Sequence, residues 1–372
     1  MGTRALYGTL LAECETELAT SAARFRLSRF RNLGTGAPAL ALTRGDVRGS
    51  EPLLARVHSS CVTSEAFGAC DCDCAGQLQA ALAEIAAAGR GALFYLFQEG
   101  RGAGFAAKAR DRMAVQASGE RVTTFDAYAA MGLARDQRRY EEVAFLCRLL
   151  GIEARLRLLT HNPEKAKALA EAGVALDGLV PLAAQQTPWN RHYLLAKSRS
   201  GHALEDPGAA GACGAPAPLA PVAPSAFDAA GRFVRVARYQ LPVLLPERAA
   251  PLWLTLHLYY DLAERCERVL LAHTARPEVA PLATVRREAL ADRFAPGFTG
   301  QRKPGWLAAL RAFEAHGAGV ALFLPPDDDR APDAETLDLL AALAGHFAVP
   351  LTDADEPALG AAIAAAIGRA AA

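Results

Sequence analysis

Hydrophobic and polar residues alternate along the first half of the chain in a way that is typical of an α/β fold. Short apolar runs predict four strands, at residues 37–46, 52–60, 91–100 and 155–161. Apolar residues at helical spacing predict three helices between and after them, at residues 75–89, 138–152 and 162–173. Strands that alternate with helices from about residue 24 to residue 182 indicate one α/β domain.

The composition changes after this domain. Residues 205–226 are rich in proline, glycine and alanine, which is typical of a semi-extended linker rather than a packed core. A chain of 372 residues has room for about two domains. We therefore expect a first domain over residues 1–204, a linker over 205–226 and a second domain over 227–372.

The second domain resembles the first in its pattern. A shift of 228 residues places "AALAEIAAAGRGALFYL", from Ala80, on "AALRAFEAHGAGVALFL", from Ala308, without a gap. Either the second domain is a degenerate copy of the first, or alanine-rich helices followed by apolar strands coincide by chance. We favour duplication, and we expect an inert copy that packs against the first or extends a dimer contact.

Charge and hydropathy exclude several classes of partner. Forty basic residues balance forty acidic ones, so no overall charge favours nucleic acid. Residues 1–26 have acidic residues within their apolar stretch and do not resemble a signal peptide. No run reaches the ~18 uninterrupted apolar residues that a membrane helix needs. We expect a cytoplasmic protein, in which clustered cysteines bind metals or do redox chemistry more often than they form disulfides.

Four of the eight cysteines lie within residues 61–74. Cys72 and Cys74 are two residues apart, and Cys61 could join them to bind zinc with a fourth position open for water, as in catalytic zinc sites. One alternative is a closed structural site that also uses Cys70, and another is that all four are packing residues. The remaining cysteines are scattered and we expect packing or surface roles for them: Cys14, Cys147, Cys213 and Cys266.

Several ordered motifs surround these cysteines. "GDVRGSEPLLARVHSSC" is followed by "CDC", which starts eleven positions after that cysteine, and then by "GRGALFYLFQEGRGAGFAAK" and "RLLTHNPEK". Over about residues 23–204, the chain resembles the GTP cyclohydrolase II family. The resemblance implies a mixed-sheet α/β domain, a homodimer, and one zinc per chain whose bound water opens the imidazole ring of GTP. It also implies release of formate and of pyrophosphate, at the entry to riboflavin biosynthesis, with Mg²⁺ bound to the triphosphate.

The resemblance also implies roles for individual residues. The zinc ligands would be Cys61, Cys72 and Cys74, with Cys70 a spectator. Arg138 would attack the α-phosphorus, with Asp136 beside it. The residues expected to bind GTP are Arg56, Val57, His58, Ser59, Ser60, Gln77, Glu99, Gly100, Arg101, Thr124, Thr160 and Lys165. The chemistry is reasonable for these residue types, because basic side chains suit a triphosphate and Glu99 could accept hydrogen bonds from guanine N–H groups.

The chain departs from the family pattern around the reacting base. If Gln116 and Gly119 anchor the alignment, a catalytic tyrosine of the family falls on Met113, whereas a slip of one residue would place Arg112 there. A methionine has no ionisable proton, so this alignment predicts that the ring opens and pyrophosphate leaves but that the formyl group is removed slowly or not at all. Tyr128, in a segment with two extra residues, is the candidate that could compensate.

In the second copy, the positions of the three expected zinc ligands would be taken by Ala289, Gly300 and Arg302, none of which can bind a metal as a thiolate. We therefore expect one active domain followed by a degenerate α/β repeat that lacks the site residues. One alternative function is hydrolysis of a related purine nucleotide in secondary metabolism or pyrimidine catabolism. Another is a GTP-binding zinc pseudoenzyme that regulates a partner, although a pure binder has no need of Asp136 and Arg138.

Overall fold

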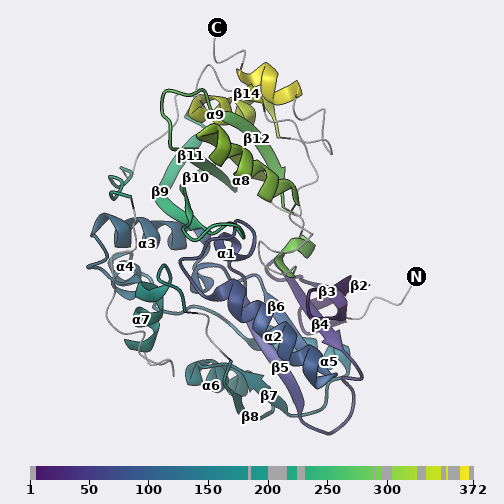
Figure 1. Ribbon diagram of the computed structural model, residues 1–372. Coiled ribbons are helices and arrows are strands. Elements are labelled where there is room, and N and C mark those ends of the chain that lie inside the picture. The colour runs from purple at the N-terminus through teal and green to yellow at the C-terminus, as the bar shows by residue number, and fades with distance from the viewer. Residues whose placement is uncertain are drawn as a thin grey trace.

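The protein contains two β-sheets, one built by each half of the chain, and the second half lies on top of the first (Figure 1). The computed structural model describes residues 6–182, 186–199, 216–223, 231–288, 290–294, 304–324, 332–344, 349–350 and 361–367. Of the expected linker, residues 205–215 and 224–226 lie outside these ranges, and residues 216–223 form neither helix nor strand.

The described part of the first half forms an eight-stranded mixed sheet in the order β1-β2-β3-β4-β6-β5-β7-β8. Its strands are β1 (Leu6–Tyr7), β2 (Leu10–Ala19), β3 (Arg24–Asn32), β4 (Pro38–Arg44), β5 (Leu53–Ser59), β6 (Gly91–Leu96), β7 (Leu156–Leu159) and β8 (Leu176–Val180). Its helices are α1 (Val62–Glu65), α2 (Cys74–Ala88), α3 (Phe105–Ala117), α4 (Thr124–Ala130), α5 (Glu141–Leu150), α6 (Pro163–Glu171) and α7 (Arg191–Arg199), with a 3-10 turn η1 (Gly100–Gly102). The mixed sheet confirms the predicted fold class, because β4 pairs antiparallel with β6 whereas β6, β5, β7 and β8 run parallel.

Local sequence explains where the predicted helices begin and end. Helix α2 buries residues at helical spacing, from Leu78 to Ile85, and stops at Gly89, whose φ of 73° is the left-handed conformation that glycine adopts without strain. Helix α6 starts at Pro163, and the side chain of Asn162 accepts hydrogen bonds from two backbone N–H groups of its first turn. Helix α2 packs on one face of the sheet, whereas α5 and α6 pack on the other.

The described part of the second half forms a six-stranded sheet in the order β14-β12-β13-β11-β10-β9. Its strands are β9 (Phe233–Val243), β10 (Leu252–Asp261), β11 (Cys266–Thr274), β12 (Leu282–Arg287), β13 (Ala318–Leu324) and β14 (Val349–Pro350). Its helices are α8 (Pro304–His316) and α9 (Ala334–Ala344), with a 3-10 turn η2 (Leu290–Phe294).

The two sheets share a strand order. Strands β2, β3, β4, β6, β5 and β7 of the first lie in the same order, with the same parallel and antiparallel pairings, as β9, β10, β11, β13, β12 and β14 of the second. Register also agrees at the centre, because Ala55 pairs with Ala92 and residues 228 positions later, Ala283 and Val320, pair as well. The predicted counterparts of the thiolates, Ala289, Gly300 and Arg302, lie outside the described residues.

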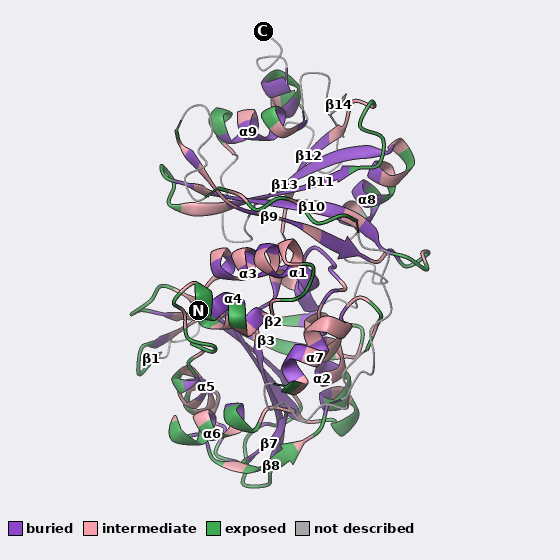
Figure 2. Cartoon of the chain, turned by 90° about the vertical axis from the view of Figure 1, so that its left-hand side faces the viewer, coloured by how far each residue is buried: buried purple, intermediate pink, exposed green. Residues whose placement is uncertain are grey.

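One face of the second sheet packs against the first half. Phe105, Ala109 and Met113 of α3 share a hydrophobic core with β9, β10 and α8. Figure 2 shows α1 and α3 sandwiched between the two sheets. Trp306, on α8, lies in the same core and donates a hydrogen bond from Nε1 to the carbonyl of Phe67, at 3.1 Å. The other face of the second sheet is covered by α9 and residues 361–367.

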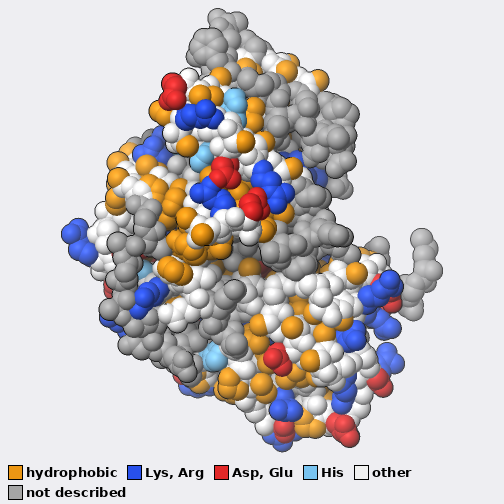
Figure 3. All heavy atoms as spheres, in the orientation of Figure 1, with side chains coloured by type: hydrophobic (Ala, Val, Ile, Leu, Met, Phe, Trp, Pro, Cys, Tyr) orange, Lys and Arg blue, Asp and Glu red, His pale blue; other side chains and the backbone are white. Residues whose placement is uncertain are grey.

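Basic and acidic side chains are interspersed on the face drawn in Figure 3, in keeping with a net charge of zero. Among the residues that the structure describes, none of the helices has the length and apolar character needed to cross a membrane.

We predict that Trp306→Ala weakens the attachment of the second half. The ring of Trp306 lies 4.8 Å from that of Phe323, which in turn contacts Phe67, so truncation leaves a cavity where the halves meet. Large-to-small core substitutions of this kind cost about 3–5 kcal/mol. Thermal unfolding of the full chain measures the effect, with Trp253→Ala on β10, which is only half-buried, as the control. Equal losses in the two variants would contradict this role of Trp306.

Candidate active site

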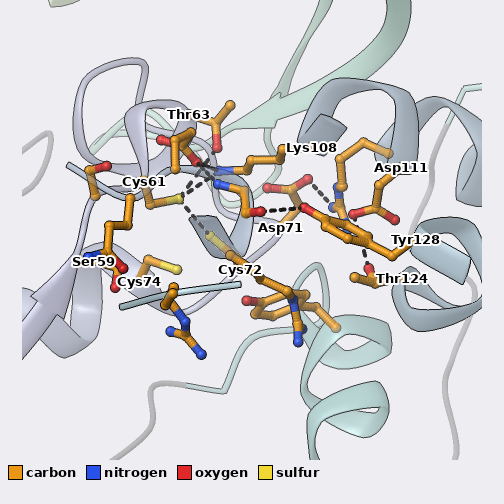
Figure 4. A pocket seen from close by; sticks show the side chains of 18 of the residues that line it. Ser59, Cys61, Thr63, Asp71, Cys72, Cys74, Lys108, Asp111, Thr124 and Tyr128 are labelled. Atoms are coloured by element: carbon orange, nitrogen blue, oxygen red, sulfur yellow. Dashed lines mark hydrogen bonds and ion pairs between the residues drawn. The ribbon is translucent and has the colours of Figure 1, made fainter. Parts of the chain in front are cut away.

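Three cysteine thiols converge at the carboxyl end of β5. Cys61 follows this strand, whereas Cys72 and Cys74 come from the loop that leads into α2. The three Sγ atoms all lie within 4.8 Å of one another, and those of Cys61 and Cys72 are 3.7 Å apart (Figure 4). Sulfur atoms around a tetrahedral zinc with Zn–S bonds of about 2.3 Å lie about 3.8 Å apart, so the cluster fits this ion.

Cys70 points away from the three thiols. Its backbone N–H donates to the carbonyl of Pro242 at 3.0 Å, and its Sγ lies 3.5 Å from the same oxygen. The residue before it, Ala69, forms an isolated antiparallel bridge with Val243. Cys70 therefore helps to fix the metal-binding loop to β9. Of the other thiols, Cys14, Cys147 and Cys266 are outside the cluster and Cys213 lies beyond the described residues.

A partly buried lysine, which the sequence analysis did not identify, lies against the cluster. Lys108 Nζ donates to Cys61 Sγ at 3.0 Å and to Glu99 Oε1 at 2.7 Å. Hydrogen bonds with Cys72 and Cys74, and then the charge of Lys108, hold the pKa of the Cys61 thiol well below its ordinary value. Burial lowers the pKa of Lys108, but the charges of Cys61 and Glu99 outweigh it and raise that pKa well above normal. Lys108 thus stabilises the first thiolate.

A cleft runs from these thiols past the end of the sheet, and we divide it into two parts. The thiolate part is lined by Ser59, Ser60, Cys61, Thr63, Asp71, Cys72, Cys74, Gln98, Glu99, Gly100, Arg101, Lys108, Asp111, Arg112, Thr124, Tyr128, Arg138, Tyr193 and Tyr239. The cationic part is lined by Arg56, His58, Ser59, Cys74, Gln77, Arg101, Arg138, Thr160, His161, Asn162, Lys165, Tyr193 and Lys197. The parts share Arg101 and Arg138, so they form one continuous cleft.

The structure brings together most of the residues expected from the sequence, but Val57, Met113 and Asp136 line neither part. Val57 is buried in the core of the first sheet, and its carbonyl accepts a hydrogen bond from Lys165. Asp136 acts through Arg138, whose Nε donates to Asp136 Oδ1 at 2.9 Å. Burial lowers the pKa of Arg138, but its bonds to Asp136 outweigh burial and raise that pKa above the ordinary value.

Met113 is a packing residue in this structure, which differs from its expected place beside the reacting base. Its side chain lies in the core between α3 and β9, and its Sδ is 3.3 Å from the backbone nitrogen of Val222. Arg112, one position earlier, points into the cleft and forms an ion pair with Asp71. Residues adjacent on a helix point about 100° apart, so Arg112 lines the cleft whereas Met113 packs in the core.

The thiolate part contains acidic and phenolic groups near Arg112. Asp111 is buried and its Oδ1 has no hydrogen-bond partner among the described residues, whereas Thr124 donates to its Oδ2 at 3.3 Å (Figure 4). Tyr128 donates its hydroxyl to the carbonyl of Gly100 at 2.9 Å. Glu99 is not free to bind a base in this state, because Lys108 and the N–H of Val62 occupy its two oxygens.

The cationic part holds several basic groups close together, and none of the described residues that line it is acidic. Arg56 donates to Leu159 O at 2.7 Å and to Gln77 Oε1 at 2.6 Å. Burial lowers the pKa of Arg56 to about 10. Burial, and then repulsion from Arg56 and Arg138, lowers the pKa of Lys165 well below its ordinary value. Asp136 and Asp73 pair with Arg138 and Lys197, but the basic groups outnumber these partners, and such an excess of positive charge is typical of a site that binds phosphates.

Two elements support the site that the sequence did not predict. Helix α7 contributes Tyr193 and Lys197. Lys197 Nζ donates to Oδ1 of Asp73 at 2.6 Å, and Asp73 lies between Cys72 and Cys74 in the sequence. From the second half, Arg293 donates to the Tyr95 hydroxyl at 3.0 Å, and Tyr95 bonds to the buried Glu65. Nothing in the sequence pattern pointed to α7 or to Arg293.

We predict that Asp111→Asn stabilises the protein above neutral pH. Burial raises the pKa of Asp111 to about 6 from the ordinary 3.8. The folded state therefore binds more protons than the unfolded chain between these two pH values. Stability from this group is greatest at low pH and falls as pH rises through that window, by about 3 kcal/mol in total. Thermal midpoints at about pH 5 and about pH 7.5 should differ less in the variant.

The exposed Asp177, on β8, gives the matched control, because Asp177→Asn makes the same chemical change at the surface instead of in the cleft. An Asp111→Asn variant that was less stable than the parent at about pH 7.5 would show that the carboxylate is stabilised by its neighbours rather than strained by burial.

Known proteins resemble the part of the chain that carries this cleft. The family model of GTP cyclohydrolase II matches residues 12–181. The chain is 44% identical over 191 residues to the GTP cyclohydrolase-2 of Cronobacter sakazakii, covering 51% of this chain and 95% of that protein. It is 43% identical over 192 residues to the GTP cyclohydrolase-2 of Pectobacterium atrosepticum, with 51% and 95% covered.

A solved structure of a two-domain 3,4-dihydroxy-2-butanone 4-phosphate synthase from A. baumannii aligns with 48% of this chain and 41% of its own, at 17% identity and a TM-score of 0.27. A likeness this low carries no argument. The relatives above, by contrast, are matched over nearly their whole length, and the residues that the family model matches include the three clustered thiols and also Arg56, Arg101, Arg138 and Lys165. The chain belongs to the GTP cyclohydrolase II family.

Proposed function

We propose that this chain is a zinc-dependent hydrolase that opens the imidazole ring of GTP and releases pyrophosphate, as a step of riboflavin biosynthesis. The observation that carries the proposal is the polarity of the cleft. Three thiols that fit a zinc ion lie in one part, and basic residues predominate in the other, where none of the described lining residues is acidic. A nucleotide has the same division, with a purine base at one end and phosphates at the other.

Cys61, Cys72 and Cys74 would hold the zinc ion. When bound there, it would supply a Lewis acid that activates water at neutral pH, which the poorly electrophilic carbon between two purine nitrogens requires. A cysteine binds zinc as a thiolate and not as a thiol. Hydrogen bonds with Cys61 raise the pKa values of Cys72 and Cys74 well above normal, so these two residues retain their protons without metal. The protons would be released on zinc binding.

The residues around the cluster would orient the base. Guanine presents N–H donors, and Asp111 Oδ1 is a buried acceptor without a partner. Arg56, Arg138 and Lys165 would bind the phosphates of GTP, which would carry Mg²⁺. A bound phosphate would restore the ordinary protonation of Lys165, so binding would take up protons. Asp136 keeps Arg138 aligned through paired hydrogen bonds and is the nearest acceptor for a proton that Arg138 would have to lose to act as a nucleophile.

We also propose that residues 227–372 are a degenerate copy of the first domain. The shared strand order and the agreement of register at the 228-residue shift support this. Residues 1–204 would then carry the zinc-binding thiols and the residues that bind the phosphates. A homodimer and a cytoplasmic location, both expected from the sequence, stay predictions.

Incubation of the purified protein with GTP and Mg²⁺ tests the proposed reaction. We expect pyrophosphate release together with a ring-opened product. A pyrophosphate assay, a formate assay and the mass of the product would measure these outcomes. Turnover of another purine nucleotide but not of GTP would favour a related cyclohydrolase. GTP binding without any product would favour a regulatory pseudoenzyme.

Metal content tests the thiol assignment separately. Cys72→Ser should lose both zinc and ring opening, because a hydroxyl is a far poorer zinc ligand than a thiolate. Cys70→Ser is the matched control, and it should keep one zinc per chain because Cys70 Sγ faces Pro242 and not the cluster. Loss of zinc from Cys70→Ser would show a closed site with four thiolates.

A further inference from the structure

The second half contributes a side chain to the cleft. Tyr239, on β9, is 1% exposed and lines the thiolate part together with Cys61, Lys108 and Asp111. Its hydroxyl is buried and has no hydrogen-bond partner among the described residues. A buried hydroxyl without a partner costs about 1–3 kcal/mol, so a ligand that pairs with it recovers that energy.

Contacts of the residues that follow Tyr239 on β9 fix its position. The amide of Gln116, on α3, donates to the carbonyl of Gln240 at 2.6 Å and accepts from its N–H at 2.8 Å. Two residues further on, Pro242 accepts from Cys70 in the metal-binding loop. Because β9 is held both to α3 and to this loop, the phenol has a defined position relative to the thiols.

Several other polar groups of the thiolate part are engaged within the protein, although the hydroxyl of Ser59 also has no hydrogen-bond partner among the described residues. The hydroxyl of Tyr128 donates to Gly100, Arg112 pairs with Asp71, and Lys108 bonds to Cys61 and Glu99. Asp111 has a free oxygen, but as a carboxylate this oxygen accepts hydrogen bonds rather than donates them. Tyr239 differs from these groups because its hydroxyl is bonded to none of the described residues, and a phenol is a stronger acid than the aliphatic hydroxyl of Ser59.

We propose that Tyr239 is a catalytic residue that protonates the departing nitrogen when the formyl group is removed. The step rests on the proposed function. Water adds to the formamide carbon, the carbon–nitrogen bond breaks, and its electron pair goes to nitrogen, which takes the proton of the Tyr239 hydroxyl. The water-derived oxygen returns a proton to Tyr239, and the products are formate and the amine.

The phenol suits this role because it keeps its proton until the step occurs. Burial raises the pKa of Tyr239 above its ordinary value, and the charge of Asp71 adds to this, whereas Lys108 and Arg112 oppose it. An amine nitrogen is a poor leaving group without a proton, so a positioned acid matters more for this step than for release of pyrophosphate. The second half is then part of the active site and not an inert copy.

The test is Tyr239→Phe in the full-length chain, which keeps the ring and removes only the hydroxyl. We expect formate release to fall by roughly 10²–10⁴-fold, the range of general acid–base catalysis, so that the formylated pyrimidine accumulates. Pyrophosphate release should stay within about threefold of the parent, and zinc content and thermal midpoint should match it. Tyr259→Phe is the control, because Tyr259 is buried in the core on the far face of the second sheet.

Several outcomes would overturn the proposal. Formate release equal to the parent would show that the hydroxyl is not the donor. Equal losses of pyrophosphate and formate, or loss of zinc, would show a structural role. A stall at the formylated product in Asp111→Asn but not in Tyr239→Phe would identify Asp111 as the acid. If the parent itself forms no product from GTP, the proposed function fails, which is a different result from failure of Tyr239 alone.

Discussion

Helix α3 must bury an apolar face, and the position of the second half follows from this constraint. Phe105, Ala109 and Met113 recur at intervals of four residues along one side of the helix, and they pack into the core beneath the second sheet. The opposite side carries Lys108, Asp111 and Arg112 into the cleft. One short helix therefore lies between an apolar interface and a charged site, and a rotation of the helix about its axis would disturb both.

Much of the first domain could be predicted because its signals are local. The four strands and three helices found from apolar spacing correspond to β4, β5, β6, β7, α2, α5 and α6. Helix α3 was not predicted, because its apolar side is marked only by Phe105, Ala109 and Met113, and a glycine-rich turn precedes it. Because no helix was predicted over this segment, the sequence did not show which side chains share a face. Met113, instead of Arg112, was therefore aligned with the residue beside the reacting base.

The site was predictable only where residues lie close together in sequence. Cys61, Cys72 and Cys74 fall within fourteen residues, so their spacing indicated a metal site. Lys108 and Tyr239 reach the same cluster through tertiary packing, at sequence separations of 47 residues for Lys108 and far more for Tyr239. Charge burial explains why such residues are needed. A thiolate removed from water requires a cation beside it, and the sequence does not reveal which element will provide one.

The apolar side of α3 has an evolutionary consequence. Once Phe105 and Met113 are packed beneath the second sheet, a chain that lost residues 227–372 would expose them to water and would invite aggregation. Restoring an independent first domain would then require several polar substitutions on one helix, each of them harmful while the second half is still present. Single substitutions can therefore make the first domain depend on the second half, whereas the reverse change requires several substitutions together.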